Sequence, residues 1–227
     1  MVYGNVGKET IQLNEHTVWS GSPNRNDNLD AWTSLPQIRQ LIFDGKQKDA
    51  EKLANKTIIT KKSHGQMFQP VGSLQLTFDG HDTYTDYYRD LDIERAVAKT
   101  SYTANGVTYT REMFASLPER VLVVQLTASK PSALSFRASY TTPQLKPVIS
   151  ANANELTIAG TTSDHEGVKG MVKYMGIAKI KTNGGTVAAN DTSLTVKDAT
   201  SATIYISIAT NFVNYKDVSG DEKARAF

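Results

Sequence analysis

Short segments in which apolar and polar residues alternate place the strongest constraint on the fold of this chain. Residues 203–208 read Thr-Ile-Tyr-Ile-Ser-Ile, and similar alternation recurs at 74–78, 122–126 and 134–138. Successive side chains of a strand point to opposite faces, so this period of two buries one face of each strand and leaves the other in water. The sequence therefore predicts a mainly β fold with two packed antiparallel sheets, a β-sandwich.

Two glycine-containing turns support this interpretation. Asn105-Gly106 separates the strand-like segments 100–103 and 107–110. Asn-Gly favours the positive φ angles of a type I′ turn, which predicts a hairpin. Asn183-Gly184-Gly185 is a second hairpin candidate, between the segments on either side of it.

One stretch departs from the β pattern. A capping-box signature begins at Ser34, and apolar residues follow at helical spacing over 38–42. Gly45 is placed to end this helix, and 47–55 reads as a second short helix. We expect a helical hairpin at roughly 34–57, inserted between strands.

Composition excludes several classes of function. The longest apolar run, 121–124, is far shorter than the roughly 20 residues of a membrane span. The 25 basic and 23 acidic residues leave a net charge of +2 and are scattered, which argues against nucleic-acid binding. Cysteine is absent, so disulfides, thiolate zinc sites and cysteine nucleophiles are excluded. These observations leave the cellular compartment open.

No composition shift or internal repeat divides the chain, so we expect a single domain over 1–227. The first residues carry no signal-peptide pattern and read as the middle of a strand. The last residues, from Asp221 onward, read as the beginning of a helix. Both ends therefore read as boundaries within a longer protein.

The search for catalytic carboxylates gives weak candidates. Glycosidases use two carboxyl groups about 5 Å or about 6.5–9.5 Å apart. Asp90 and Asp92 share one face of a predicted strand, but alternation there is simpler to interpret as a solvated edge with Leu91 and Ile93 inside.

Asp164 and Glu166 could supply an acid or a base, but they lie in a turn-rich segment where polar residues are ordinary. Metal binding has little support, because the histidines show no ligand spacing. They are His16, His64, His81 and His165. Asp79 to Asp82 reads as a turn and not as a calcium loop.

The most unusual segment is a loop that follows the first predicted strand and contains Asn14, His16, Trp19 and Ser20. Sugars stack their apolar faces on aromatic rings and bind short polar groups through their hydroxyls, so this loop suits sugar recognition. Alternatively, Trp19 fills one end of the sandwich while Asn14 and Ser20 satisfy the backbone of a turn.

At this loop the sequence resembles a known family. Residues 9–21, ETIQLNEHTVWSG, are similar to the wording "ETIQLNEDTLWSG" of glycoside hydrolase family 95, the α-L-fucosidase and α-L-galactosidase family, with departures at His16 and Val18. Further motifs resemble the same family in the same order. They are FQPVGSL at 68–74, YRDLD at 88–92, GVTYTREMFAS at 106–116 and FVNY at 212–215.

The resemblance implies the N-terminal β-sandwich, or supersandwich, of a longer enzyme. In that family a helical linker, an (α/α)6 catalytic barrel and a C-terminal β domain follow, and the barrel carries the inverting hydrolysis. The resemblance therefore places no catalytic residue, cofactor or metal ligand in 1–227. It also implies that residues completing the first strand precede Met1.

The expected partners are the protein's own (α/α)6 barrel and the fucosylated oligosaccharide or glycan on which the enzyme acts. The candidate wall of the sugar site is the loop just described. It comprises Asn14, His16, Thr17, Trp19 and Ser20. Rival interpretations are an autonomous carbohydrate-binding module and a plain interaction scaffold. The family's role in glycan degradation suggests a periplasmic or secreted bacterial protein.

Overall fold

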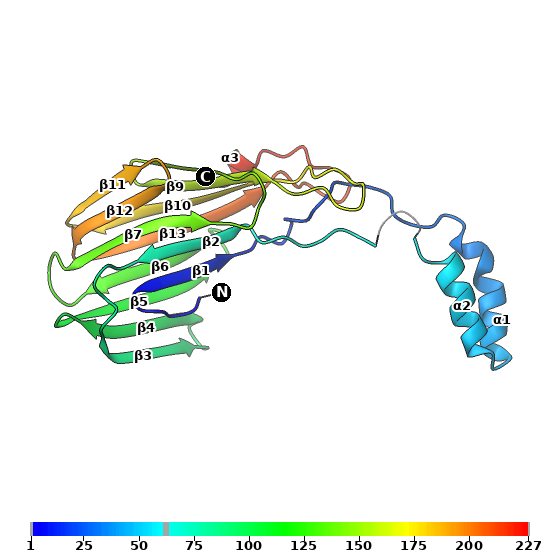
Figure 1. Ribbon diagram of the computed structural model, residues 1–227, viewed down its shortest axis with the longest axis horizontal. Helices are drawn as coiled ribbons and strands as arrows, with labels where there is room; N and C mark the ends of the chain where they lie inside the picture. Colours follow the sequence, from blue (N-terminus) through cyan, green and yellow to red (C-terminus); the bar gives the residue numbers. More distant parts are fainter. Residues whose placement is uncertain (1, 61–63, 227) are drawn as a thin grey trace.

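Two antiparallel sheets dominate the computed structural model, which describes residues 2–60 and 64–226 (Figure 1). The five-stranded sheet has the order β1 (Lys8–Leu13), β2 (Gly72–Thr77), β7 (Leu134–Thr141), β12 (Ser193–Ala199), β11 (Thr186–Asn190). The eight-stranded sheet has the order β3 (Thr85–Asp92), β4 (Val97–Ala104), β5 (Val107–Ser116), β6 (Val121–Ala128), β13 (Ser201–Thr210), β10 (Lys173–Asn183), β9 (Glu155–Thr161), β8 (Val148–Asn152).

The core lies between these sheets and is built from alternate residues of their strands. Leu74 and Leu76 of β2 are fully buried, as are Ile204 and Ile206 of β13. Tyr205, between those two isoleucines, points to the other face of its sheet and is exposed. The predicted β-sandwich is therefore confirmed.

The two predicted hairpins have different outcomes. Asn105 and Gly106, both at positive φ, join β4 to β5 as a true hairpin. Asn183-Gly184-Gly185 is also a turn, but the hairpin predicted there is wrong. β10 pairs with β9 and β13, whereas β11 pairs with β12 in the other sheet. Gly184 and Gly185, with φ of 72° and 67°, let the chain cross between the sheets.

The prediction that Leu91 and Ile93 are buried is also wrong. β3 is an edge strand as expected, but the two residues are 65% and 87% exposed. Leu91 pairs with Ala98 and lies on the inward face of the eight-stranded sheet. In Figure 1, β3 is the outermost strand and lies beyond β1, the last strand of the smaller sheet, so the smaller sheet does not reach β3.

The helical hairpin is confirmed. It consists of a 3-10 turn, η1 (Ala31–Ser34), and two helices, α1 (Leu35–Phe43) and α2 (Gln47–Thr57). The predicted capping box is wrong, because Ser34 makes no side-chain cap and its hydroxyl donates to the Ala31 carbonyl instead. Gly45 ends α1 at a φ of 71°, where the Lys46 N–H donates to the Leu41 carbonyl.

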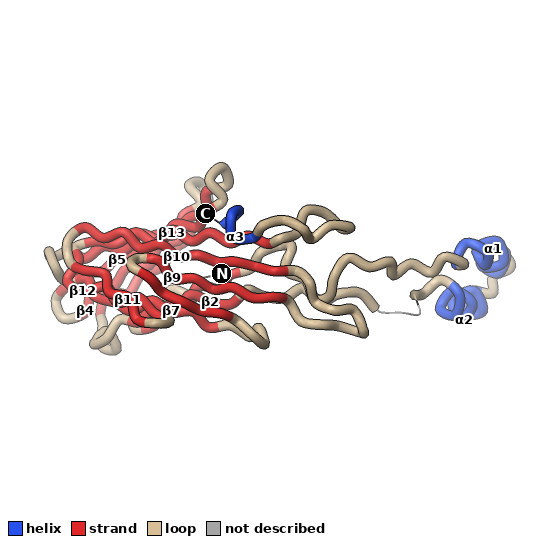
Figure 2. The backbone as a smooth tube through the Cα atoms, turned by 90° about the horizontal axis from the view of Figure 1, so that it is seen from above, coloured by secondary structure: helices blue, strands red, loops and turns tan. Residues whose placement is uncertain are grey.

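Figures 1 and 2 show the helical hairpin well away from the sandwich, with an extended segment leading from the end of β1 towards α1. We call residues 22–60, which contain the hairpin and its connections, the arm. A third helix, α3 (Glu222–Ala226), packs against β10 and β13. Among the described residues, no helix combines the length and apolar character of a membrane span.

A buried ion pair ties the first residues of the chain to the larger sheet. Arg111 Nη1 lies 2.6 Å from Glu9 Oε2, and both side chains are almost completely buried. Glu9 Oε1 accepts hydrogen bonds from the backbone N–H groups of Tyr3, Gly4 and Thr10. The Arg111 guanidinium also lies over the Phe78 ring, 5.1 Å from its centroid. Such a pair is tolerated in a core because each charged group is hydrogen-bonded.

Candidate functional site

The candidate loop lies where β1 ends, on the side of the sandwich from which the arm leaves (Figure 1). Backbone hydrogen bonds connect it to two other loops. Ser20 N–H donates to the Met67 carbonyl, and Gly21 N–H donates to the Ser163 carbonyl. Gln69 N–H donates to the Val18 carbonyl. The loop is thus a fixed part of this end of the sandwich.

Two of the predicted site residues serve mainly to hold the loop. The Thr17 hydroxyl donates to Glu15 Oε2 at 2.5 Å and lies 2.5 Å from the Thr210 hydroxyl on β13. Ser20 is buried, accepts a hydrogen bond from Met67 N–H at 2.8 Å and donates to Gln66 Oε1. Because these hydroxyls already have partners, they position the loop.

The other three predicted residues face the solvent. Asn14 is exposed, and the His16 side chain is 90% exposed with Nδ1 3.0 Å from Glu15 Oε1. Trp19 is 44% exposed, and its indole N–H donates to the His16 carbonyl at 2.9 Å. The indole orientation is therefore fixed while part of the ring remains open to a ligand.

Phe68 completes an aromatic pair that the sequence did not single out as a site residue. Its ring meets Trp19 edge-to-face at 5.5 Å between centroids, and it is as exposed as Trp19. A short backbone bridge pairs Trp19 with Phe68. Exposed aromatic rings that are held in place in this way suit the apolar face of a sugar. Phe68 lies within one of the family-like motifs, which was the available signal.

The two candidate carboxylates of this end, Asp164 and Glu166, are each hydrogen-bonded to neighbouring loop residues. Asp164 Oδ1 accepts the Gly170 N–H at 2.8 Å, which shapes the turn. Glu166 contacts His64, with 2.7 Å between Oε1 and Nδ1. The hydrogen bonds from the His64 side chain and backbone lower the pKa of the exposed Glu166 carboxyl. Glu166 is therefore poised as an anion and not as an acid.

Asp90 and Asp92 do not join this loop. They lie on the edge strand β3, where Asp92 Oδ1 accepts the N–H groups of Glu94 and Arg95 in the following turn. Within the described ranges, no group of three or more acidic or histidine side chains could hold a metal ion.

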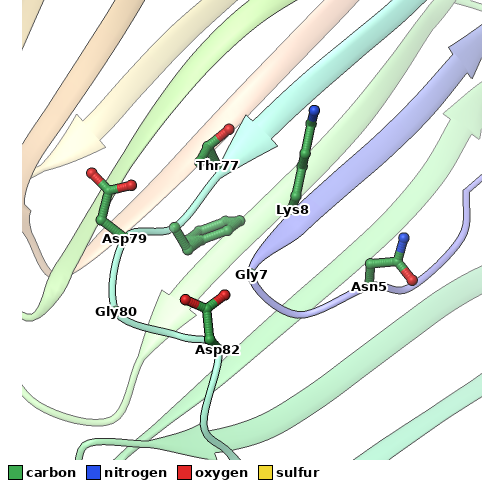
Figure 3. Close-up of a pocket in the computed structure, with 8 residues that line it drawn as sticks. Asn5, Gly7, Lys8, Thr77, Asp79, Gly80 and Asp82 are labelled. Atoms are coloured by element: carbon green, nitrogen blue, oxygen red, sulfur yellow. The ribbon is translucent and has the colours of Figure 1, made fainter.

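A surface depression lies at the opposite end of β1. Its volume is about 540 Å³, and Figure 3 shows Lys8, Asp79 and Asp82 around it. The residues after β2 form the turn that the sequence predicted there. Since Lys8 pairs with Thr77 and Leu13 with Gly72, this depression is one strand length away from the candidate loop. It shares no residue with the predicted site.

Two packed antiparallel sheets with an exposed aromatic pair at one end define the chain as a β-sandwich domain. The chain belongs to the family "Glycosyl hydrolase family 65, N-terminal domain", whose model matches residues 1–215.

Similar proteins include α-fucosidases. The chain is 32% identical to Alpha-L-fucosidase 2 of Arabidopsis thaliana, over 93% of this chain and 27% of that protein. It is 23% identical to Probable alpha-fucosidase A of Aspergillus niger, over 99% of this chain and 28% of that protein. A solved structure, "Putative kojibiose phosphorylase from human microbiome", matches with a TM-score of 0.40 and 7% identity, over 73% of this chain and 27% of that one. The chain thus spans about a quarter of the length of these relatives.

Proposed function

We propose that residues 1–227 form the non-catalytic N-terminal domain of an α-L-fucosidase-type glycoside hydrolase of family 95. The parent enzyme hydrolyses terminal α-L-fucosyl or α-L-galactosyl linkages with inversion, using residues of an (α/α)6 barrel outside this chain. The names of the Arabidopsis and Aspergillus relatives support the fucosidase assignment.

The loop after β1 walls the aglycone side of the barrel's active site. The observation that carries this proposal is the exposed Trp19 ring, which is held in place by its bond to the His16 carbonyl and by Phe68. Asn14, His16 and Trp19 supply the contacts to the sugar beyond the fucose. Thr17 and Ser20 keep the loop in shape.

The first test compares the 227-residue chain with a longer polypeptide extended through the catalytic domain, on an aryl α-L-fucoside and on 2′-fucosyllactose. Activity in the longer polypeptide alone is expected. Activity in the short chain would contradict the proposal and direct attention to Asp90, Asp92, Asp164 and Glu166.

The role of the loop is tested by Trp19→Ala in the longer polypeptide. On 2′-fucosyllactose, kcat/KM should fall about tenfold, which corresponds to ~1.4 kcal/mol of lost binding. Tyr88→Ala removes a similarly exposed aromatic ring from the edge strand β3 and should change nothing. Equal kinetics for the two variants would refute the assignment of the loop.

An autonomous carbohydrate-binding module is the second candidate, favoured by the solvent-exposed Trp19–Phe68 pair. Titration of the 227-residue chain with free 2′-fucosyllactose distinguishes it. Saturable binding that Trp19→Ala abolishes would support a module, whereas no binding supports a wall that acts only with the barrel.

A further inference from the structure

The arm carries more apolar surface than its own packing uses. Ile38 of α1 and Ala50 of α2 are buried where the two helices meet. Outside this contact, large apolar side chains stand open to solvent. They are Leu29, Trp32, Leu35, Ile42, Phe43, Ile58 and Ile59. Trp32 and Phe43 are 70% and 83% exposed, respectively.

Part of this surface lies along α1 and the turn before it. Leu35 and Ile42 are seven residues apart, so they lie on one line along α1. Trp32 precedes this line on η1, and Phe43 flanks its far end. We call these four residues the arm stripe. α1 is thus apolar over a wider face than α2 covers.

The arm is too small to be stable alone. Its helices contain 9 and 11 residues, and isolated helices shorter than about 12–15 residues are marginal in water. Helices in proteins are stabilised chiefly by packing an apolar face on a partner. In Figures 1 and 2 no sheet lies beside either helix. Among the described residues, no surface outside the arm packs against its helices.

We propose that the arm stripe docks into an apolar groove on the catalytic domain of the same polypeptide. This rests on the proposed function and adds the surface that holds the two domains together. The length of the relatives supports this partner. The chain matches 27% of the Arabidopsis protein, so most of that relative lies outside the matched region and could supply the groove.

The root of the arm supports the same partner. The arm begins directly after Gly21, whose N–H and carbonyl bond to Ser163 and Met171. Met67, on the returning segment, is bonded to Ser20. A domain held by the arm stripe is therefore brought to the end of the sandwich that presents Trp19.

Hydrogen exchange measured by mass spectrometry tests the docking. In the longer polypeptide, amides of α1 and α2 should exchange at least about tenfold more slowly than in the 227-residue chain, because exchange reports local opening. Ile42→Asp should remove this protection. Gln37→Asp, which places the same residue on an exposed polar position of α1, should retain it.

A second comparison separates docking from helix stability. In the 227-residue chain Ile42 is already exposed, so the arms of Ile42→Asp and the unmodified protein should exchange alike. Equal exchange of the unmodified arm in the short and long proteins would overturn the proposal. A concentration-dependent dimer of the short chain that Ile42→Asp dissociates would also overturn it, because a second copy would then be the occupant.

The outcome is separable from that of the fucosidase assay. An active longer polypeptide with an unprotected arm refutes the docking and leaves the proposed function standing. A protected arm in a polypeptide that does not cleave fucosides refutes the fucosidase assignment and leaves the docking standing.

Discussion

Arg111→Met should destabilise this protein far more than the loss of an ordinary ion pair. The substitution removes the only side-chain ion pair of Glu9 within the described structure, and the Glu9 side chain is 0% exposed. Removing one partner of a buried pair typically costs about 3–5 kcal/mol, because the other charge stays buried without compensation. Three backbone N–H groups still hold Glu9 Oε1, so we expect about 3 kcal/mol. Methionine also removes the guanidinium that lies over the Phe78 ring, but it fills a similar apolar volume.

Urea unfolding of the 227-residue chain, followed by circular dichroism, measures this cost. The matched control is Lys179→Met, which breaks a pair of the same length, 2.6 Å to Glu155, at an exposed position. That change should cost less than about 1 kcal/mol. If both variants lose the same stability, the buried pair does not hold the N-terminal segment and the argument from burial fails.

Two further predictions use the same unfolding assay. Tyr140→Phe should raise the free energy of unfolding by about 1 kcal/mol, since the buried Tyr140 hydroxyl has no partner among the described residues. Tyr102→Phe should lower it by a similar amount, because it removes the hydrogen bond to His81. A Tyr140→Phe variant less stable than Tyr102→Phe would contradict this reasoning. Burial, helped by the Arg111 charge, lowers the pKa of His81 from 6.5, so the unfolded chain gains a proton first and stability should fall as the pH drops below about 6.5. His81→Gln should reduce the change of unfolding free energy with pH, whereas His16→Gln, at an exposed position, should leave it as it is. An unchanged pH dependence in His81→Gln would show that His81 is not the group responsible.

Much of the fold follows from local patterns in the sequence. Period-two alternation locates strands such as 203–208, and Asn105-Gly106 specifies its hairpin through φ angles that glycine and asparagine tolerate. Helical spacing likewise locates α1 and α2. These features depend on residues close together in the chain, which is why a single sequence reveals them.

The errors arose where a property depends on distant residues. Alternation at Leu91 identifies an inward face but does not show whether the opposite sheet reaches it. Asn183 to Gly185 specifies a turn but not the sheet that the chain then joins. At the candidate site, composition identified Trp19, while Phe68 lies 49 positions later and meets it only in the fold. The same holds for Thr210, whose contact fixes Thr17.

The way the arm leaves and re-enters the sandwich makes it an insertion in the topological sense. Ser20 and Met67 are hydrogen-bonded to each other, so the chain departs from and returns to one point of the β structure. The sheets are therefore complete without the intervening residues, and closing so long a loop adds only a slowly growing entropic cost. The length and sequence of the arm can therefore change over evolution while the strand register stays the same. The distance that the arm extends from the sandwich can vary without any substitution in the core.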